Sequence, residues 1–425
     1  MTNVGTGVSG LDDILAGGLP AERLYVLEGD PGAGKTTLAM QFLLEGIRTG
    51  ERGLYITLSE SETEIRAIAE AHGWSLDGLA ILEISAAEGD YDEENTLFHP
   101  AEVELGERIQ DIFEEVARVA PKRIVVDSCS ELRLLAQSPL RFRRQVLSLK
   151  RRLADRGVTV LLIDNPTDRD GDVLLQSLAH GVIHLEQLAP LYGAERRRLR
   201  VTKLRGVAFR GGWHDFTIRQ GGLAVYPRLI AAEHVDEAAP TPRAETASSG
   251  IAALDALTHG GLERGTMTLV MGPAGTGKSA LATQYAAAAA ARGERAVLYT
   301  FEEGTDLLRR RAAALGQDIE GPLARGDIRI RRIDPAELAP GQFAHVIRED
   351  VERHDARVVV IDSLNGYLHA MPDERFLTLH LHEVLTYLRH RGALGILVEA
   401  QHGLVGGMQS PVDVSYLADT VLLLR

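Results

Sequence analysis

The chain has 425 residues, of which 45% are hydrophobic and 25% are charged, and its formal net charge is −14. This composition is that of a globular protein, and the length predicts two or three domains. The acidic charge argues against broad nucleic-acid binding, which relies on a basic surface. The single cysteine, Cys129, excludes a disulfide or a cysteine-ligated zinc within the chain. Because no signal-peptide pattern and no apolar run of membrane-spanning length occur, we expect a cytoplasmic protein without a membrane segment.

The first predicted elements are a strand and a helix that follow a glycine-rich opening motif. This motif covers residues 6–12 (TGVSGLD), and Gly17, Gly18 and Leu19 come shortly after it. Residues 24–27 form a short apolar run that predicts a strand. Residues 36–47 repeat apolar side chains at helical spacing, and Gly50 is a suitable helix end.

A glycine-rich loop joins this strand to this helix and matches G-x-x-x-x-G-K-[ST]. The residues that we expect to cradle a phosphate are Gly29, Asp30, Pro31, Gly32, Ala33, Gly34, Lys35, Thr36 and Thr37. Glycines let backbone N–H groups curl around the anion, the lysine reaches the β- and γ-phosphates, and the hydroxyl ligates Mg²⁺. The positive end of the following helix points at the same anion. The loop therefore predicts a nucleotide site.

Further strands of the first half are predicted by continuous β-branched runs at residues 54–58, 123–127 and 158–164. These runs show no polar alternation, which is typical of strands buried on both faces. We therefore predict an α/β fold with a mainly parallel sheet flanked by helices, and we expect phosphate at the carboxyl ends of the strands.

The second half of the chain repeats the first. A linker rich in Ala, Pro, Glu, Thr and Ser separates the halves, so we predict a first domain over 1–232, a linker over 233–248 and a second domain over 249–425. The opening motif recurs at residues 249–255, and the predicted strands are 267–271, 296–301, 357–362 and 395–400. The second phosphate-binding loop contains Gly272, Pro273, Ala274, Gly275, Thr276, Gly277, Lys278, Ser279 and Ala280.

An aspartate ends one predicted strand in each half. Asp127 follows Arg-Ile-Val-Val, and Asp362 follows Val-Val-Val-Ile. A carboxylate at this position can hold Mg²⁺ through water, or it can simply cap a helix. We predict the metal role, with Thr36 and Ser279 as the hydroxyl ligands of the two sites.

Hydrolysis of a nucleotide also needs a carboxylate that polarises the attacking water. The residues directly after the strand-end aspartates are serines, so the base must come from elsewhere. Glu60 follows Lys35 at the same spacing as Glu303 follows Lys278, and Glu302 precedes Glu303. We predict Glu60, Glu302 and Glu303 as catalytic bases, in the placement that RecA-like ATPases use.

Together these motifs resemble those of the KaiC family of clock ATPases. The resemblance rests on the duplicated RecA-like halves, the opening motifs, the Glu pair after Phe301 and the motif Lys203-Leu204-Arg205-Gly206. It covers roughly residues 3–230 and 247–425. It implies tandem P-loop domains that bind ATP and Mg²⁺ and form a hexameric double ring. It also implies that Lys203 and Arg205 reach the nucleotide of the neighbouring subunit, where a cation can offset phosphoryl charge.

The chain departs from the family pattern at three places. Ser59 replaces the first glutamate of the first pair, and Phe209 replaces a usual histidine. The second half stops at Arg425, before any counterpart of Lys203 and Arg205, so the second site is expected to turn over ATP slowly.

The family's phosphosites fall on Ser415 and Tyr416, of which Ser415 keeps the residue type. Gln401, after a strand, is a candidate sensor of the γ-phosphate, and so is Asn165.

Three functions stay open from the sequence. The leading one is a ring-forming ATPase that gates a protein partner, such as a small KaiB-like adaptor or a response regulator. The second is a serine/threonine autokinase with Glu302 as base and Ser415 as acceptor. The third is a DNA-associated recombinase or helicase motor, with residues 141–144 and 150–152 as its nucleic-acid candidates. At helical spacing these cations more simply form a solvated or inter-subunit face. The second half could also bind ATP only as a scaffold.

Overall fold

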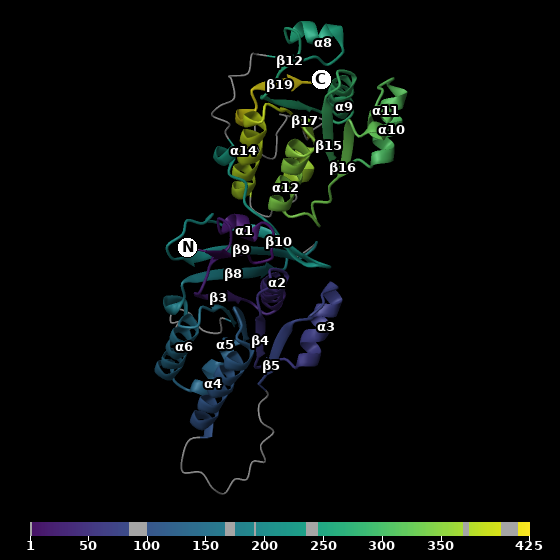
Figure 1. Ribbon diagram of the computed structural model, residues 1–425. Helices are drawn as coiled ribbons and strands as arrows, with labels where there is room; N and C mark the ends of the chain where they lie inside the picture. The colour runs from purple at the N-terminus through teal and green to yellow at the C-terminus, as the bar shows by residue number, and fades with distance from the viewer. Residues whose placement is uncertain are drawn as a thin grey trace. The chain divides into compact units, whose positions relative to one another are not determined.

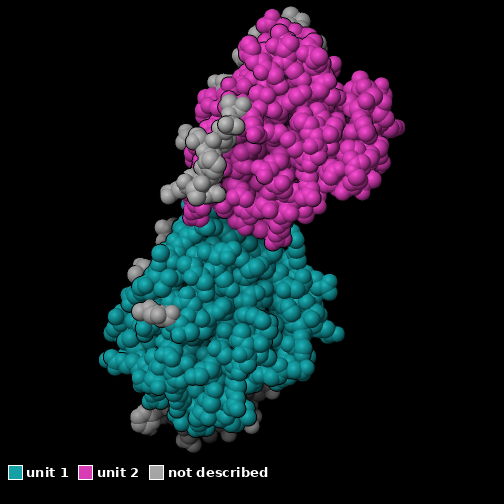
Figure 2. Space-filling model, turned by 45° about the horizontal axis from the view of Figure 1, so that its top comes forward, with its two compact units in different colours: residues 1–190, 195–228 teal, residues 191–194, 229–425 magenta. Residues whose placement is uncertain are grey.

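The computed structural model describes residues 2–84, 100–165, 175–190, 193–234, 245–368, 374–400 and 415–425, and for 100–105, 374–376 and 415 the backbone alone. The chain divides into two compact units, coloured separately in Figure 2. Unit 1 contains residues 1–190 and 195–228, and unit 2 contains residues 191–194 and 229–425. The domain boundaries at 232 and 249 stay a prediction. No helix among the described residues is long and apolar enough to cross a membrane.

Unit 1 is built on a nine-stranded sheet with the order β11-β10-β9-β8-β3-β7-β6-β4-β5. The strands from β8 to β5 are parallel, and β9, β10 and β11 extend the sheet as an antiparallel meander. The strands of this sheet are β3 (Leu24–Gly29), β4 (Gly53–Thr57), β5 (Leu79–Glu83), β6 (Arg123–Asp127), β7 (Thr159–Asp164), β8 (Gly181–Leu188), β9 (Arg196–Leu204), β10 (His214–Arg219) and β11 (Gly222–Tyr226). Two short strands, β1 (Asn3–Val4) and β2 (Leu19–Pro20), form a separate antiparallel pair.

Helices cover both faces of this sheet (Figure 1). They are α1 (Leu11–Ile14), α2 (Lys35–Arg48), α3 (Glu62–His72), α4 (Pro100–Val119), α5 (Cys129–Ala136) and α6 (Pro139–Ala154). One core contains buried residues of α1, α2 and α3, and another contains those of α4, α5 and α6. The central strand β3 is buried along its whole length, as expected for a strand between two helical layers.

Unit 2 repeats the parallel part of this architecture. Its six-stranded sheet has the order β16-β15-β17-β18-β14-β19, and all its pairings are parallel. Its strands are β12 (Thr246–Ala247), β13 (Leu262–Glu263), β14 (Met267–Gly272), β15 (Arg295–Thr300), β16 (Ile328–Arg332), β17 (Ala356–Asp362), β18 (Leu394–Ala400) and β19 (Thr420–Leu423). The order matches β5-β4-β6-β7-β3-β8 of unit 1 strand for strand, so the duplication in the sequence is a duplication of structure.

The helices of unit 2 are likewise divided between two cores (Figure 1). They are α8 (Ala252–Leu257), α9 (Lys278–Ala291), α10 (Thr305–Ala314), α11 (Glu320–Arg325), α12 (Pro340–Glu352), α13 (Leu364–Leu368) and α14 (Glu374–His390), with the 3-10 turns η1 (Ala231–His234) and η2 (Ser415–Leu417). The turn η1 packs against α14, and the Ala231 amide donates to Glu383 at 2.8 Å. The fold class predicted from the sequence, tandem units with mainly parallel sheets between helices, is confirmed.

Candidate nucleotide sites

The glycine-rich loop of unit 1 lies between β3 and α2, at the carboxyl end of the sheet. Gly29 has φ +156°, and a Cβ there would lie 2.2 Å from the carbonyl oxygen of Leu185 on β8. Gly34 precedes α2 with φ +98°. Only glycine adopts such backbone easily, so the loop can approach the neighbouring strand closely. The Lys35 ammonium donates to the carbonyl oxygens of Gly29 and Asp30, both at 2.7 Å.

The loop of unit 2 has nearly the same geometry. Gly272 has φ +154°, and a Cβ there would lie 2.3 Å from the carbonyl oxygen of Leu424. Gly277 precedes α9 with φ +93°. The Lys278 ammonium donates to the carbonyl oxygen of Pro273 at 2.7 Å. In each unit the lysine thus folds over its own loop, where a phosphate would replace loop carbonyls as its partner.

The strand-end aspartate of unit 1 lies beside the loop hydroxyl, as a magnesium site requires. The Thr36 hydroxyl is 3.1 Å from Asp127 Oδ2, and the Tyr55 hydroxyl donates to the same oxygen at 2.6 Å. Burial raises the pKa of Asp127, while Tyr55, Thr36 and Lys35 oppose that rise. A hydroxyl and a carboxylate are the hard oxygen groups that Mg²⁺ takes alongside phosphate and water.

In unit 2, Asp362 and Ser279 form the matching carboxylate–hydroxyl pair, and no counterpart of the Tyr55 contact occurs among the described residues. Burial raises the pKa of Asp362, and the Ser279 hydroxyl opposes the rise through a hydrogen bond. No cluster of three or more metal-binding side chains occurs among the described residues. A magnesium ion held mainly by phosphate, water and one hydroxyl needs no such cluster. Both aspartate–hydroxyl pairs therefore fit Mg²⁺.

In unit 1, Glu60 lies just beyond the end of β4, near Asp127. Its Oε2 atom is buried and has no hydrogen-bond partner among the described residues. Burial raises its pKa, and the nearby charges of Asp127 and Glu64 raise it further. The Thr57 side chain fixes its backbone, accepting from the Glu60 amide at 3.0 Å and donating to the Glu60 carbonyl at 2.7 Å. A buried carboxylate oxygen without a partner can accept a proton from water.

The two glutamates of unit 2 are engaged by neighbours instead. Glu303 forms a two-pronged ion pair with Arg311 on α10, with distances of 2.6 and 2.7 Å. Glu302 is exposed and accepts from the Ser363 hydroxyl at 2.8 Å. The two units, similar in their loops, therefore differ at the residues predicted as bases.

Lys203 and Arg205 do not lie at the loop of their own unit. Lys203 is near the end of β9, which runs antiparallel to β8, and it pairs with Val182. The backbone amide of Arg205 donates to the carbonyl oxygen of His180, at the start of β8. Gly29 pairs with Leu185, which is five residues further along β8 than His180. The two cations thus stand at the amino edge of the sheet, opposite the phosphate-binding edge.

Several other sequence predictions meet different outcomes. Gln401 and the side chain of Ser415 lie outside the described residues. The Oδ1 atom of Asn165, after β7, is buried without a hydrogen-bond partner among the described residues.

Phe142 is buried in the core of α6 with Arg133 over its ring, so it cannot stack on a nucleic-acid base. The basic residues of α6 therefore lack the exposed aromatic partner that single-strand binding uses.

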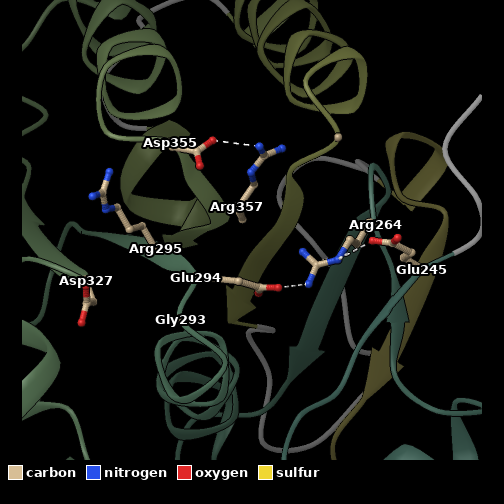
Figure 3. A pocket seen from close by; sticks show the side chains of 9 residues that line it. Glu245, Arg264, Gly293, Glu294, Arg295, Asp327, Asp355 and Arg357 are labelled. Carbon is tan, nitrogen blue, oxygen red and sulfur yellow. Dashed lines mark hydrogen bonds and ion pairs between the residues drawn. The ribbon is translucent and has the colours of Figure 1, made fainter. Parts of the chain in front are cut away.

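The cavity in Figure 3, of about 540 Å³, is a separate feature of unit 2. It lies at the amino ends of β15, β17 and β18, away from the phosphate-binding edge. Four of its charged residues form ion pairs: Arg357 pairs with Asp355 at 2.9 Å, and Arg264 pairs with Glu294. Arg295 donates instead to the backbone carbonyl oxygen of His354 at 3.1 Å.

The contacts of Tyr55 and Ser363 and the pairing of Arg311 were not predicted from the sequence. Each of the three side chains donates a hydrogen bond to a carboxylate that was predicted as a site residue. Tyr55 donates to Asp127, Ser363 to Glu302 and Arg311 to Glu303. Tyr55 gave one usable signal, because a tyrosine inside an apolar strand needs a partner for its buried hydroxyl. The other two contacts depend on how loops and helices fold back on the strands.

Two parallel α/β units, each with a lysine-hydroxyl loop between a strand and a helix and an aspartate at a nearby strand end, define a tandem RecA-like P-loop ATPase. Comparison with known proteins narrows the class. The family described as ATPase KaiC matches residues 4–230 and 247–425, and the chain belongs to this family. The predicted family resemblance is therefore confirmed, and ATP binding and hydrolysis are the activities of this class.

The similar curated proteins carry the name circadian clock oscillator protein KaiC. That of a Picosynechococcus species is 27% identical over 430 residues, which are 99% of this chain and 81% of the relative. That of Thermostichus vulcanus is 28% identical over 430 residues, with the same coverage. That of a Nostoc species is 27% identical over 428 residues, again 99% of this chain and 81% of the relative.

Proposed function

We propose that this KaiC-family chain is a Mg-dependent ATPase that assembles into a ring, taken as a hexamer. ATP bound by unit 1 would lie between neighbouring copies, and its turnover would gate a protein partner. A small KaiB-like adaptor or a response regulator is the kind of partner we propose, since the named relatives are clock oscillator proteins.

The position of Lys203 and Arg205 is the observation that carries the ring proposal. The His180 amide donates to the carbonyl oxygen of Leu24, and the Arg205 amide donates to the carbonyl oxygen of His180. Arg205 and Leu24 therefore lie at the same position along the direction of the strands. Leu24 is five residues before Gly29, which at about 3.3 Å per residue is a separation of about 16 Å along the strand. These cations cannot reach the phosphates of their own loop, so any nucleotide they serve belongs to another copy.

Within unit 1, different residues would bind the phosphates, hold Mg²⁺ and activate the attacking water. The loop amides and Lys35 would bind the phosphates, and Thr36 and Asp127 would hold Mg²⁺. When bound, Mg²⁺ neutralises charge on the β- and γ-phosphates. Glu60 would accept the proton of the attacking water, and the neighbour's Arg205 would offset charge on the transferred phosphoryl group. In unit 2, Lys278, Ser279 and Asp362 would bind a second ATP.

The autokinase alternative, with Glu302 as base and Ser415 as acceptor, stays a prediction. Glu302 accepts a hydrogen bond from Ser363, and no contact among the described residues favours phosphoryl transfer to a side chain. The DNA motor likewise stays a prediction, and the burial of Phe142, the aromatic residue of α6, argues against it.

Light scattering with and without a non-hydrolysable ATP analogue tests the ring. Bound nucleotide that bridges copies stabilises the assembly by mass action, so the analogue should raise the mass of the particle severalfold. Lys35→Ala should weaken this response, because it removes a phosphate contact at the bridging site. A monomer at micromolar protein under saturating analogue would contradict both the ring and the trans role of Arg205.

A further inference from the structure

Three cationic side chains of unit 1 meet on three consecutive backbone carbonyls. The Lys150 ammonium, the Lys203 ammonium and the Arg205 guanidinium donate to the carbonyl oxygens of Leu178, Gln176 and Ser177, at 2.7, 2.6 and 3.2 Å respectively. These carbonyls end the helical turn of residues 175–178. Terminal helix carbonyls lack intrahelical partners and carry negative partial charge, so they gather cations.

Lys150 reaches this cluster from α6, a different element from the one that carries Lys203 and Arg205. On α6, Val146, Leu149 and Leu153 are buried in the core, whereas Lys150 is half-buried at the margin. Its long side chain extends to the end of the 175–178 turn, and its hydrogen bond to Leu178 there is only partly buried. The cluster is therefore built by tertiary packing: the sequence shows the basic run 150–152, but it does not show that Lys150 meets Lys203 and Arg205.

The positive charge of the cluster has no counter-charge in the part of the chain that the structure describes. None of the three cations forms an ion pair with a carboxylate there. The pKa values of Lys150 and Lys203 are both lowered, first by burial and then by positive neighbours that include Arg205. Burial, together with the positive charges of Lys150, Arg23 and Arg205, lowers the pKa of His180 to about 4. An uncompensated positive cluster in a chain of net charge −14 is a site for an incoming anion.

We propose that Lys150 is a third trans-acting cation, which contacts the phosphates of the ATP bound to unit 1 of the neighbouring copy together with Lys203 and Arg205. This inference rests on the proposed ring. An ammonium has three N–H donors. Lys150 can therefore keep its bond to Leu178 and still donate to a phosphate oxygen.

The counterpart position in unit 2 differs in character. Lys150 lies nine residues before the start of β7. The residue nine positions before the start of β18, the equivalent strand of unit 2, is Leu385, which is 3% exposed and part of the core. A leucine there packs and cannot bind phosphate. The proposed role of Lys150 therefore belongs to unit 1 alone.

Steady-state ATP hydrolysis in a Lys278→Ala background, which silences unit 2, tests the proposal. Lys150→Gln removes the charge and keeps a shorter polar side chain at this position. We expect turnover to fall about fivefold or more, since losing one donor at developing charge costs at least this much. The matched control is Arg151→Gln, which removes an exposed charge from the next residue of α6 and should leave turnover unchanged. Thermal unfolding should be the same for both variants.

Mixed rings separate a trans role from a role within one subunit. Glu60→Gln copies lack the base but keep all three cations, and Lys150→Gln copies keep the base. When the two are mixed, sites with Glu60 will lie against an intact cluster, so turnover should exceed the weighted sum of the separate variants. A chain with both Glu60→Gln and Lys150→Gln, mixed with Lys150→Gln, should give no such gain.

Two results would overturn the inference. Unchanged turnover in Lys150→Gln, with a loss of tenfold or more in Arg205→Ala, would leave the ring proposal intact and exclude Lys150. A loss in Lys150→Gln without any gain on mixing with Glu60→Gln would place its effect inside its own subunit. Unchanged turnover in Arg205→Ala, by contrast, would refute the proposed function itself.

Discussion

Individual side chains explain why the two units, with nearly the same phosphate loop, need not have the same activity. Glu60 has a buried carboxylate oxygen without a hydrogen-bond partner among the described residues, whereas Glu303 is bound on both oxygens by Arg311. A carboxylate held by an arginine is a poorer acceptor for a proton of water, because its negative charge is already compensated. The difference favours unit 1 as the faster ATPase.

Lys35 and Lys278 should each control one bound nucleotide. Each ammonium lies over its loop, bonded to loop carbonyls. Lys35→Ala or Lys278→Ala should reduce the stoichiometry of bound ATP from two per chain to one, because the β- and γ-phosphates lose their cation. Equilibrium dialysis with Mg-ATP measures this ratio. Two bound nucleotides in either variant would contradict the assignment of that loop.

The pH dependence of unit 1 should report the raised pKa of Glu60. Catalysis needs the ionised carboxylate, so turnover falls as the pH drops through this pKa, which burial places above the ordinary value of 4.5. Measured in a Lys278→Ala background, the acid limb should therefore lie above pH 4.5. Glu64→Gln removes a neighbouring negative charge and should move the limb to lower pH. A limb at or below 4.5, or one that Glu64→Gln leaves in place, would argue against Glu60 as base.

At the scale of the elements, the parallel strands were predictable and much around them was not. Continuous apolar runs predicted β3, β4, β6 and β7 to within two residues, because strands buried on both faces leave no other pattern. The strands β10 and β11 were missed: the polar residues Asp215 and Thr217 interrupt the apolar pattern of β10, and β11 is a short run of five residues. The site was predictable where one motif holds the residues, as in the loops. The contacts of Tyr55, Arg311 and Lys150 arise from elements far apart in the sequence.

The close approach of β3 and β8 should depend on Gly29. Gly29→Ala would place a Cβ 2.2 Å from the carbonyl oxygen of Leu185, so the strands must separate, at a cost of about 1–3 kcal/mol in the free energy of unfolding. ATP binding to unit 1 should be lost with it. Gly50→Ala is the control, since Gly50 also has positive φ but nothing lies within 4 Å of its Cβ position. Urea unfolding and nucleotide stoichiometry compare the two. Equal effects would show that only backbone strain matters.

For the whole molecule, the duplication supplies two candidate ATP sites in one chain, and the proposed ring joins each unit 1 to the next copy. The amino-edge cations of unit 1 have no function within their own subunit that the described contacts reveal, beyond capping the 175–178 turn. In a ring they would face a neighbour's phosphates. The account therefore makes unit 1 the main motor, working across the subunit interface, with unit 2 as a slower site.

Steady-state ATP hydrolysis by two variants distinguishes unit 1 from unit 2 as the main motor. Arg205→Ala should lower the rate at least about tenfold, because an arginine in trans offsets phosphoryl charge, and it should leave ATP binding at unit 2 intact. Glu302→Gln combined with Glu303→Gln should change the rate little, as should the control Arg143→Ala on the exposed face of α6. If the double glutamine variant lost most of the activity while Arg205→Ala kept it, unit 2 would be the motor and the account would be wrong.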